Sequence, residues 1–395
     1  MLDTNDLYHG IEEVVPEGGL DERLKNEKAL VVKVGFDPTT QDLHLGHTLL
    51  LHKASQFQKL GHTVVVIIGD FTARIGDPSG KSATRPVLDA KTVKENGQFF
   101  IKQVQRILDP TLTKIVMNST WYDDMTAEQL IQLCTQFTVA RMLERNDFSE
   151  RFSANMPLGI HEFIYPILQG YDSVKIKADV ELGGTDQKFN LLMGRTYQKH
   201  HQMAQQVVMM MPLLEGTDGV KKMSKSYDNH ISISNPPKEM YGQLMAISDQ
   251  LMWRYLDLIP LFTKTEVLEW QRLVEQGENP KNIKMKLAKR CVSAYYDDEQ
   301  AEIAEQSFIS LFQKNTINED ELEQVSLSSL NQDGTLAYHL KLMGLVSSTS
   351  EGNRMIQSGA VKINDEKISD RQFKVNWSVG DVVRVGKRRI KKISL

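Results

Sequence analysis

Apolar residues gather in short runs along the first half of the chain, and longer amphipathic stretches separate these runs. Residues 29–36 (ALVVKVGF) and 62–70 (HTVVVIIGD) are almost continuously apolar, which is typical of strands covered on both faces. An amphipathic helix is expected between them, from about 47 to 60. Further strands are expected at 113–118, 173–178 and 206–214. This alternation predicts an α/β fold with a doubly wound parallel sheet, in which ligands bind at the carboxyl ends of the strands.

The remaining patterns divide the chain into domains. Residues 1–234 are predicted to form a Rossmann-like domain with a helical insertion at about 111–153, which is longer than a crossover needs and is a candidate partner or dimer surface. From 235 to 318 only helical periodicity continues, which predicts an all-helical domain. The acidic, Ser/Asn-rich stretch 319–335 is interpreted as a linker. Residues 336–395 combine short helical patterns with alternating strands, so a small α+β domain is expected.

Composition narrows the class of protein. The chain has 395 residues, 41% hydrophobic and 25% charged, which excludes disorder, collagen and a disulfide scaffold. The longest aliphatic run, Val64 to Ile68, is far shorter than the roughly 20 residues that cross a bilayer. The acidic start has no signal-peptide layout, so a soluble cytoplasmic protein without a membrane partner is expected. Cys134 and Cys291 lie in apolar helical patterns and are predicted to be buried packing residues.

Charge is distributed unevenly along the chain. The net charge is −4, but the segment from Leu336 to Leu395 holds 12 Lys and Arg against 5 Asp and Glu. A basic module therefore follows an acidic body. A patch of this kind either meets nucleic-acid phosphates or is a solvated face.

The loop GFDPTTQDLHLGH, residues 35–47, joins the first strand to the first long helix. Backbone N–H groups and the helix dipole make the helix start a site for a phosphate. His44 and His47 add donors whose charge is expected to vary near neutral pH, and Gly46 lets a flat base approach the backbone. The alternative is that these residues only form a polar helix cap.

A second polar loop, VKKMSKS, covers Val220 to Ser226 and precedes the predicted helical domain. Its lysines Lys221, Lys222 and Lys225 suit a polyphosphate, although a charged, solvated loop is the alternative. HLGH after the first strand with KMSKS after the last strand is the signature pair of class I aminoacyl-tRNA synthetases, which this sequence resembles strongly.

Within that class the chain resembles the bacterial tyrosyl-tRNA synthetases over essentially its whole length. The resemblance is carried by GFDPT (35–39), IGDPSGK (75–81), YPILQGYD (165–172), GGTDQ (183–187), KMSKS and an S4-like tail. It implies a catalytic domain at 1–234, an anticodon-binding helical domain at 235–318 and an S4-like RNA-binding domain at 336–395.

The resemblance also implies roles for single residues. ATP would be contacted by Asp37, Thr39, His44, Gly46 and His47, with Asp186 near the ribose. Its phosphates would be covered by Lys222, Lys225 and Ser226, helped by Lys81 and Arg85. Tyrosine would be surrounded by Asp77, Tyr165, Gln169, Asp172 and Gln187.

The spacing of these residues supports the roles to different degrees. Tyr165, Gln169 and Asp172 fall at i, i+4 and i+7, so they share one helix face and can converge on one molecule. Asp77 sits in a tight turn, where a carboxylate often only bonds the local backbone. Asp186 and Gln187 follow two glycines at a helix start, where capping is the alternative.

The sequence departs from the family at Lys33, where a tyrosine that meets the substrate phenol is usual. Strand alternation places Lys33, Gly35 and Asp37 on one side, so Lys33 is expected to face the pocket. In this hypothesis Asp172 accepts the phenolic proton and Lys33 assists it. The alternative is that Lys33 extends to solvent at the strand edge.

The predicted function is ATP-dependent activation of L-tyrosine and its transfer to the 3′ end of tRNA(Tyr). Mg²⁺ is expected to arrive with ATP, without a dedicated protein metal site, and a homodimer is implied by the family. The tRNA would be held by the basic tail and by Lys281, Lys284, Lys286, Lys289 and Arg290, whose alternative role is a solvated helix face. The rival functions are a tryptophan-specific ligase and a non-catalytic RNA-binding protein, and amino-acid-dependent diphosphate exchange separates them.

Overall fold

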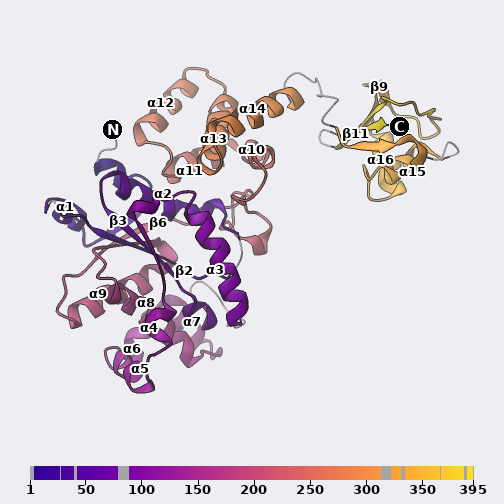
Figure 1. The fold of residues 1–395 in the computed structure, drawn as a ribbon. Coiled ribbons are helices and arrows are strands. Elements are labelled where there is room, and N and C mark those ends of the chain that lie inside the picture. The colour runs from indigo at the N-terminus through magenta and orange to yellow at the C-terminus, as the bar shows by residue number, and fades with distance from the viewer. Residues whose placement is uncertain are drawn as a thin grey trace. The chain divides into compact units, whose positions relative to one another are not determined.

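The structure is a computed structural model of the chain. It describes residues 4–26, 28–39, 42–78, 89–312, 322–330, 334–364, 366–386 and 389–394. The chain divides into two compact units, Met1–Glu305 and Gln306–Leu395, which are described separately (Figure 1).

A six-stranded sheet forms the centre of the first unit. Its strand order is β1-β6-β5-β2-β3-β4. The bounds are β1 Glu13–Val15, β2 Val31–Phe36, β3 Thr63–Ile68, β4 Thr113–Met117, β5 Val180–Gly184 and β6 Val207–Met211. All neighbours are parallel except β1, which pairs antiparallel with β6. The predicted parallel sheet is therefore confirmed, with an antiparallel edge strand that the sequence pattern did not indicate.

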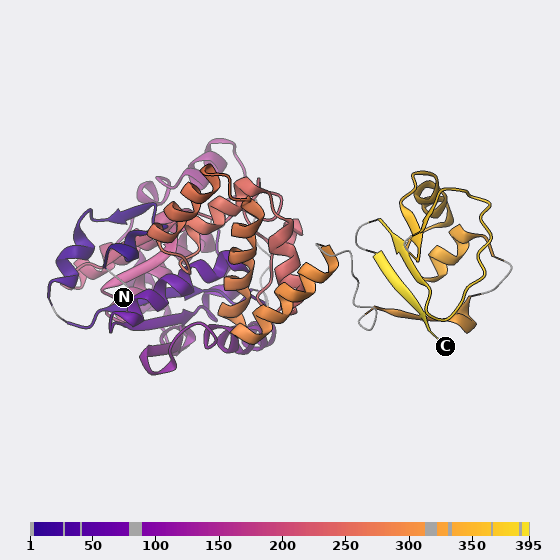
Figure 2. The same ribbon diagram turned by 90° about the horizontal axis from the view of Figure 1, so that it is seen from above.

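Helices cover both faces of this sheet because the chain winds in two directions. From β2 it passes through α2 (Leu45–Lys59) to β3 on one side, and from β5 through α9 (Lys188–His200) to β6 on the other. Crossovers between parallel strands are right-handed, so opposite directions place the helices on opposite faces, as Figures 1 and 2 show. The direction changes between β2 and β5, where a ligand crevice is expected at their carboxyl ends.

The strand predicted at 173–178 is wrong, because these residues complete the helix α8 (Ile160–Lys175) and the turn after it. Six alternating residues also fit the last turn of a helix with one apolar side. Helices α8 and α9 pack closely, and Gly170 permits this contact, since a Cβ there would lie 2.9 Å from the carbonyl carbon of Met193.

The helical insertion follows β4, which belongs to the sheet, so it begins later than the predicted position of about 111. Its helices are α4 Ser119–Tyr122, α5 Ala127–Cys134, α6 Val139–Met142 and α7 Asn146–Ser153. Leu133, Met142 and Phe148 form a small core with Ile167 of α8 and Tyr197 of α9.

The predicted helical region contains α10 Pro237–Ala246, α11 Asp249–Leu258, α12 Lys264–Glu275, α13 Pro280–Tyr295 and α14 Asp298–Phe312. Most of this region lies in the same compact unit as the sheet. Cys291 is fully buried in it as predicted, whereas Cys134 in the insertion is only half-buried. Within the described residues, no helix is both long and apolar enough to cross a membrane.

The second unit is a small α+β module built on a five-stranded sheet of order β7-β11-β10-β8-β9. The strands are β7 Gln324–Ser326, β8 Val361–Ile363, β9 Glu366–Ile368, β10 Val382–Val385 and β11 Arg389–Ser394, with helices α15 Leu336–Leu342 and α16 Thr349–Gln357. Strand β7 lies within 319–335, the range expected to be a linker, and pairs in parallel with β11. This part of the range therefore belongs to the module.

Candidate active site

Most of the predicted site residues lie at the carboxyl edge of the central sheet or on helices that reach it. Asp37 and Thr39 follow β2, and His44 directly precedes α2. Asp77 follows the short helix η2 (Thr72–Arg74) after β3, and Asp186 and Gln187 belong to η4 (Thr185–Gln187) after β5. Lys225 and Ser226 begin η5 (Lys225–Tyr227) in the loop after β6.

Backbone hydrogen bonds join the start of α2 to residues 231–233, which follow the KMSKS loop. The N–H of Leu45 donates to the carbonyl of Ile231 at 3.0 Å, and the N–H of Ile233 donates to the carbonyl of Leu43 at 3.1 Å. The start of α2 and the segment after KMSKS are therefore held side by side, although about 190 residues separate them in the sequence.

The two imidazoles of HLGH stack on one another with ring centroids 3.7 Å apart. Burial lowers the pKa of His44 to about 2, helped by the neighbouring His47, His230 and Lys225, and burial lowers the pKa of His47 to about 4. The expectation that their charge varies near neutral pH is therefore wrong, and both rings are neutral there. Gly46 avoids a tight contact here, since a Cβ would lie 3.1 Å from the His44 ring.

Two lysines of the KMSKS loop are paired with carboxylates across the crevice. Lys225 Nζ lies 3.2 Å from Asp42 Oδ2, and Lys222 Nζ lies 3.6 Å from Asp186 Oδ2. The loss of water around Asp186 raises the pKa of its carboxyl, a shift that Lys222 opposes. Exposed pairs of this kind contribute little stability, so a phosphate can replace either carboxylate.

The face of α8 carries the three polar residues that the spacing predicted. Tyr165 Oη donates to Asp37 Oδ2 at 2.9 Å. A residue predicted to bind the amino-acid substrate therefore contacts a residue predicted to bind ATP. Asp172 is buried and accepts from Trp121 Nε1 at 2.9 Å and from Tyr122 Oη at 2.7 Å.

Burial raises the pKa of Asp172 to about 6, although nearby Lys33 and the donors Tyr122 and Trp121 oppose this shift. Neither of these two aromatic residues was among the site residues predicted from the sequence. Their signal was available, because they follow Asn118 at the end of the predicted strand 113–118.

A network of side-chain amides joins the other residues that are assigned to the tyrosine substrate. Gln187 Nε2 donates to Asp77 Oδ2 at 2.9 Å, and Asn190 Nδ2 donates to the Oε1 atoms of Gln169 and Gln187, both at 3.0 Å. Asn190 was also missed, since a lone amide in an amphipathic helix gives no signal of its own.

Lys33 does not make the expected contact with Asp172. Its ammonium lies 2.7 Å from Glu181 Oε1 and donates to the Gln169 carbonyl at 2.9 Å and to Ser173 Oγ at 2.8 Å. The three N–H groups are thus used inside the protein. The alternative of a solvated lysine is also wrong, because the side chain is 1% exposed.

Some predicted residues are not joined to the others by a described side-chain contact. Thr39 donates its backbone N–H to the carbonyl of Asp37, and Ser226 donates its N–H to Ser224. Lys81 and Arg85 lie outside the described residues. No group of three or more His, Cys, Asp or Glu in the described ranges is placed to hold a metal ion.

Three of the five basic residues of α13 that were predicted to hold tRNA pair with carboxylates of the protein. Lys284 is buried and donates to Asp249 and to the Ile247 carbonyl. Lys289 pairs with Glu302 and Glu305, and Arg290 pairs with Glu266. Lys284 is therefore not available to a phosphate, whereas contact of Lys281, Lys286, Lys289 and Arg290 with tRNA stays a prediction.

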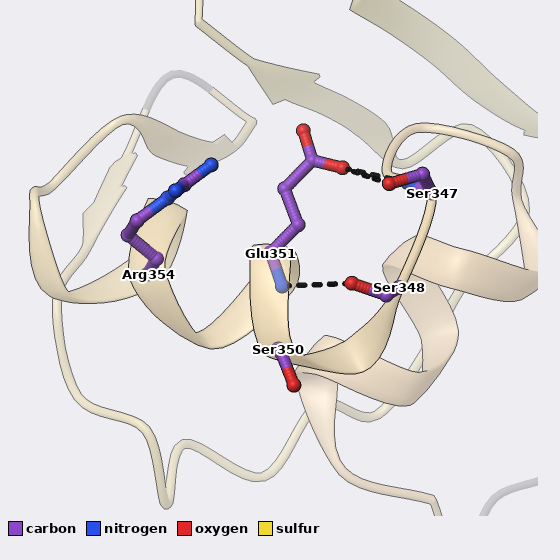
Figure 3. A pocket seen from close by; sticks show the side chains of 5 residues that line it. All are labelled: Ser347, Ser348, Ser350, Glu351 and Arg354. Atoms are coloured by element: carbon purple, nitrogen blue, oxygen red, sulfur yellow. Dashed lines mark hydrogen bonds between the residues drawn. The ribbon is translucent and has the colours of Figure 1, made fainter.

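The C-terminal unit has a polar hollow at the start of α16, shown in Figure 3. Glu351 lines it and accepts from the N–H and hydroxyl of Ser347, and it pairs with Arg389. The hydrogen bonds from Ser347 lower the pKa of Glu351 to about 2. Arg354 is the exposed cation on its rim.

A doubly wound α/β domain whose HLGH and KMSKS segments meet at the switch between strand directions is the catalytic domain of a class I aminoacyl-tRNA synthetase. Residues 25–313 match the family described as tRNA synthetases class I (W and Y), and residues 336–383 match the S4 domain. The chain belongs to this tRNA synthetase family.

Relatives and solved structures agree with this assignment. The chain is 51% identical over 391 residues to tyrosine–tRNA ligase of Legionella pneumophila, covering 99% of this chain and 97% of that one. It is 48% identical to tyrosine–tRNA ligase of Coxiella burnetii, covering 99% and 98%. A tyrosyl-tRNA synthetase from Archaeoglobus fulgidus complexed with L-tyrosine shares the fold, with a TM-score of 0.60, 21% identity and coverage of 76% and 96%.

Proposed function

We propose that this chain is a tyrosine–tRNA ligase, which activates L-tyrosine with ATP and transfers the tyrosyl group to tRNA(Tyr). The main supporting observation is that the segment directly after KMSKS is hydrogen-bonded to the start of α2. The helix face that carries Tyr165, Gln169 and Asp172 contacts the loop before α2, because Tyr165 donates to Asp37. The relatives named tyrosine–tRNA ligase, matched over nearly the whole chain, support the choice of tyrosine over tryptophan.

In the first step an oxygen of the tyrosine carboxylate attacks the α-phosphorus of ATP. The bond from that phosphorus to the bridging oxygen breaks, and diphosphate leaves with the electron pair. The carboxylate is already a nucleophile, so the protein supplies position and charge stabilisation instead of a strong base. Neutral His44 donates a hydrogen bond to a phosphate oxygen. Lys222 and Lys225 exchange Asp186 and Asp42 for the departing diphosphate.

Magnesium is proposed to enter on the phosphates of ATP. Asp42 and Asp186 lie beside the lysines that are assigned to the phosphates and are paired with them. Within the described residues they do not form a cluster suited to the ion. When bound, the ion neutralises phosphate charge.

Selection of tyrosine is assigned to Asp172. Its ionised carboxylate accepts the phenolic hydrogen, while Trp121 and Tyr122 hold it in place through hydrogen bonds. Phenylalanine would leave this buried carboxylate without that donor, and a site of this kind rejects the smaller substrate strongly. The general principle is itself illustrated by tyrosyl-tRNA synthetase.

In the second step the terminal ribose hydroxyl of tRNA attacks the carbonyl carbon of tyrosyl-adenylate, and AMP leaves. We assign tRNA binding to the basic S4 domain and to Lys281, Lys286, Lys289 and Arg290 of α13. Contacts with phosphates dominate such binding and make it dependent on salt.

The proposed active form is a homodimer joined through the helical insertion. Large apolar side chains are exposed in the insertion, namely Ile131 at 64%, Val139 at 65% and Phe152 at 62%, and Ile160 at the start of α8 is 77% exposed. Apolar groups concentrated on one region mark an interface with another protein surface. A second copy of the chain carries the same apolar region, so two copies can pair these regions across a two-fold axis.

Amino-acid-dependent exchange of diphosphate into ATP tests the proposed activity. Exchange with tyrosine, and much weaker exchange with tryptophan or phenylalanine, is expected. Tryptophan-dependent exchange would favour the related ligase, and no exchange with any of the twenty amino acids would contradict the enzymatic function.

A further inference from the structure

We propose that Asn190 and Arg145 act together as positioning residues, which fix the orientation of the Gln169 and Gln187 amides in the tyrosine pocket. The inference rests on the proposed function, because both glutamines are assigned to tyrosine there. Asn190 lies in the first turn of α9 and is 1% exposed.

Arg145 directly precedes α7, the last helix of the insertion, and several contacts hold its side chain. Its Nε and Nη2 donate to the two carboxylate oxygens of Asp147 at 2.6 and 2.7 Å, and its guanidinium carbon lies 4.3 Å from the centre of the Phe148 ring. The remaining terminal nitrogen, Nη1, donates to Asn190 Oδ1 at 3.3 Å. Arginine has no acceptor atom, so the Asn190 oxygen must face Arg145.

The orientation of Asn190 decides the orientation of both glutamines. With its oxygen toward Arg145, its two N–H groups face the Oε1 atoms of Gln169 and Gln187. The glutamine amides must therefore present oxygen to Asn190. The other end of Gln187 donates to Asp77, whose carboxylate oxygen accepts this hydrogen bond.

The resulting chain of hydrogen bonds runs in one direction, from Arg145 through Asn190 and Gln187 to Asp77. Reversing it would place N–H groups against the guanidinium and an amide oxygen against the carboxylate. Both reversed contacts oppose groups of like polarity in a partly buried site, so only one orientation is stable. The pocket therefore offers tyrosine a single pattern of donors and acceptors.

The decisive variant is Asn190→Asp, which keeps the shape but removes both N–H donors. It can still pair with Arg145, so folding is expected, but the glutamines must turn their amino groups toward the new carboxylate. We expect the KM for tyrosine in diphosphate exchange to rise about tenfold or more, the change that corresponds to about 1.4 kcal/mol. The KM for ATP should stay within about twofold, since the network touches the amino-acid side of the site.

Matched variants separate orientation from general damage. Asn235→Asp makes the same chemical change at an amide that donates to Gln243 at 2.9 Å, and should leave both KM values unchanged. Arg145→Met should raise the KM for tyrosine, and Arg145→Lys, which keeps a cationic donor, should restore part of the loss.

Absence of exchange in the wild-type protein would mean that the proposed function fails. Normal exchange in the wild type, with an unchanged tyrosine KM in Asn190→Asp, would overturn the positioning role. A parallel rise in both KM values would overturn it as well. If Asn190→Asp did not fold, the variants Arg145→Met and Arg145→Lys would test the proposal instead. Equal tyrosine KM values in Arg145→Met and the wild type would refute it.

Discussion

Lys33 and Glu181 are direct neighbours on the parallel strands β2 and β5, and their charged groups meet at 2.7 Å with both side chains almost completely buried. Glu181 also accepts from Ser173 and Gln206, and Lys33 holds the carbonyl of Gln169. The pair thus fastens α8, which carries the tyrosine-binding face, to the sheet.

Lys33→Met is expected to destabilise the protein by about 3–5 kcal/mol, because it leaves a buried glutamate without its cation. Urea unfolding measures this change. The double variant Lys33→Met/Glu181→Gln should recover much of the loss, since neither charge then remains. Selection of tyrosine over phenylalanine should change little in the double variant. A stable Lys33→Met protein that loses only this selection would instead place Lys33 against the substrate.

Tyrosine binding should weaken as the pH falls through about 6, the value to which burial raises the pKa of Asp172. Protonation below this pH removes the acceptor for the phenol. The effect on folding has the opposite sign: the folded state binds the proton more tightly than the unfolded state, so this group increases the free energy of unfolding as the pH falls. Tyrosine KM values on both sides of pH 6, with Asp172→Asn as the comparison, test the assignment.

His44→Ala and Lys225→Ala should each raise the activation free energy of adenylate formation by about 2–4 kcal/mol, the range for loss of one preorganised donor. Lys175→Ala, which removes an exposed lysine near the end of α8, serves as the control. Because the pKa of His44 is about 2, its contribution should not titrate near neutral pH. Near-native single-turnover rates in both variants would contradict the assignment of the signature loops.

Truncation after Phe312 should leave activation of tyrosine intact and weaken charging of tRNA. The cut must precede β7, because that strand belongs to the C-terminal sheet. Loss of the basic module should also reduce the salt dependence of tRNA binding. If tRNA affinity and its salt slope were the same in the full and truncated proteins, the S4 domain would have no part in binding.

Ile160→Asp should convert the protein to a monomer, because it places a charge in the apolar region proposed as the dimer interface. Sedimentation velocity measures the change. Val379→Asp makes a comparable substitution at an exposed apolar residue of the C-terminal unit and should leave the dimer intact. A wild-type protein that sediments as a monomer would refute the interface.

The sequence by itself determined the fold class, the two signature loops and the helix face of Tyr165, Gln169 and Asp172. The fold class and the helix face follow from periodicity and spacing along the chain. The two loops were identified by their resemblance to the signature pair of class I aminoacyl-tRNA synthetases. The same local reasoning failed at 173–178, where a short alternating run fits a strand or the end of a helix equally well.

Only the tertiary structure decided which distant groups meet. The pairing of Lys33 with Glu181 depends on the register of two strands that are about 150 residues apart in the sequence. The neutral state of His44 depends on burial by segments that the sequence does not place beside it. The role of Asn190 depends on its contact with Arg145, which belongs to the insertion. Both partners fix the direction of a hydrogen bond, and the sequence around Asn190 does not reveal that Arg145 is its partner.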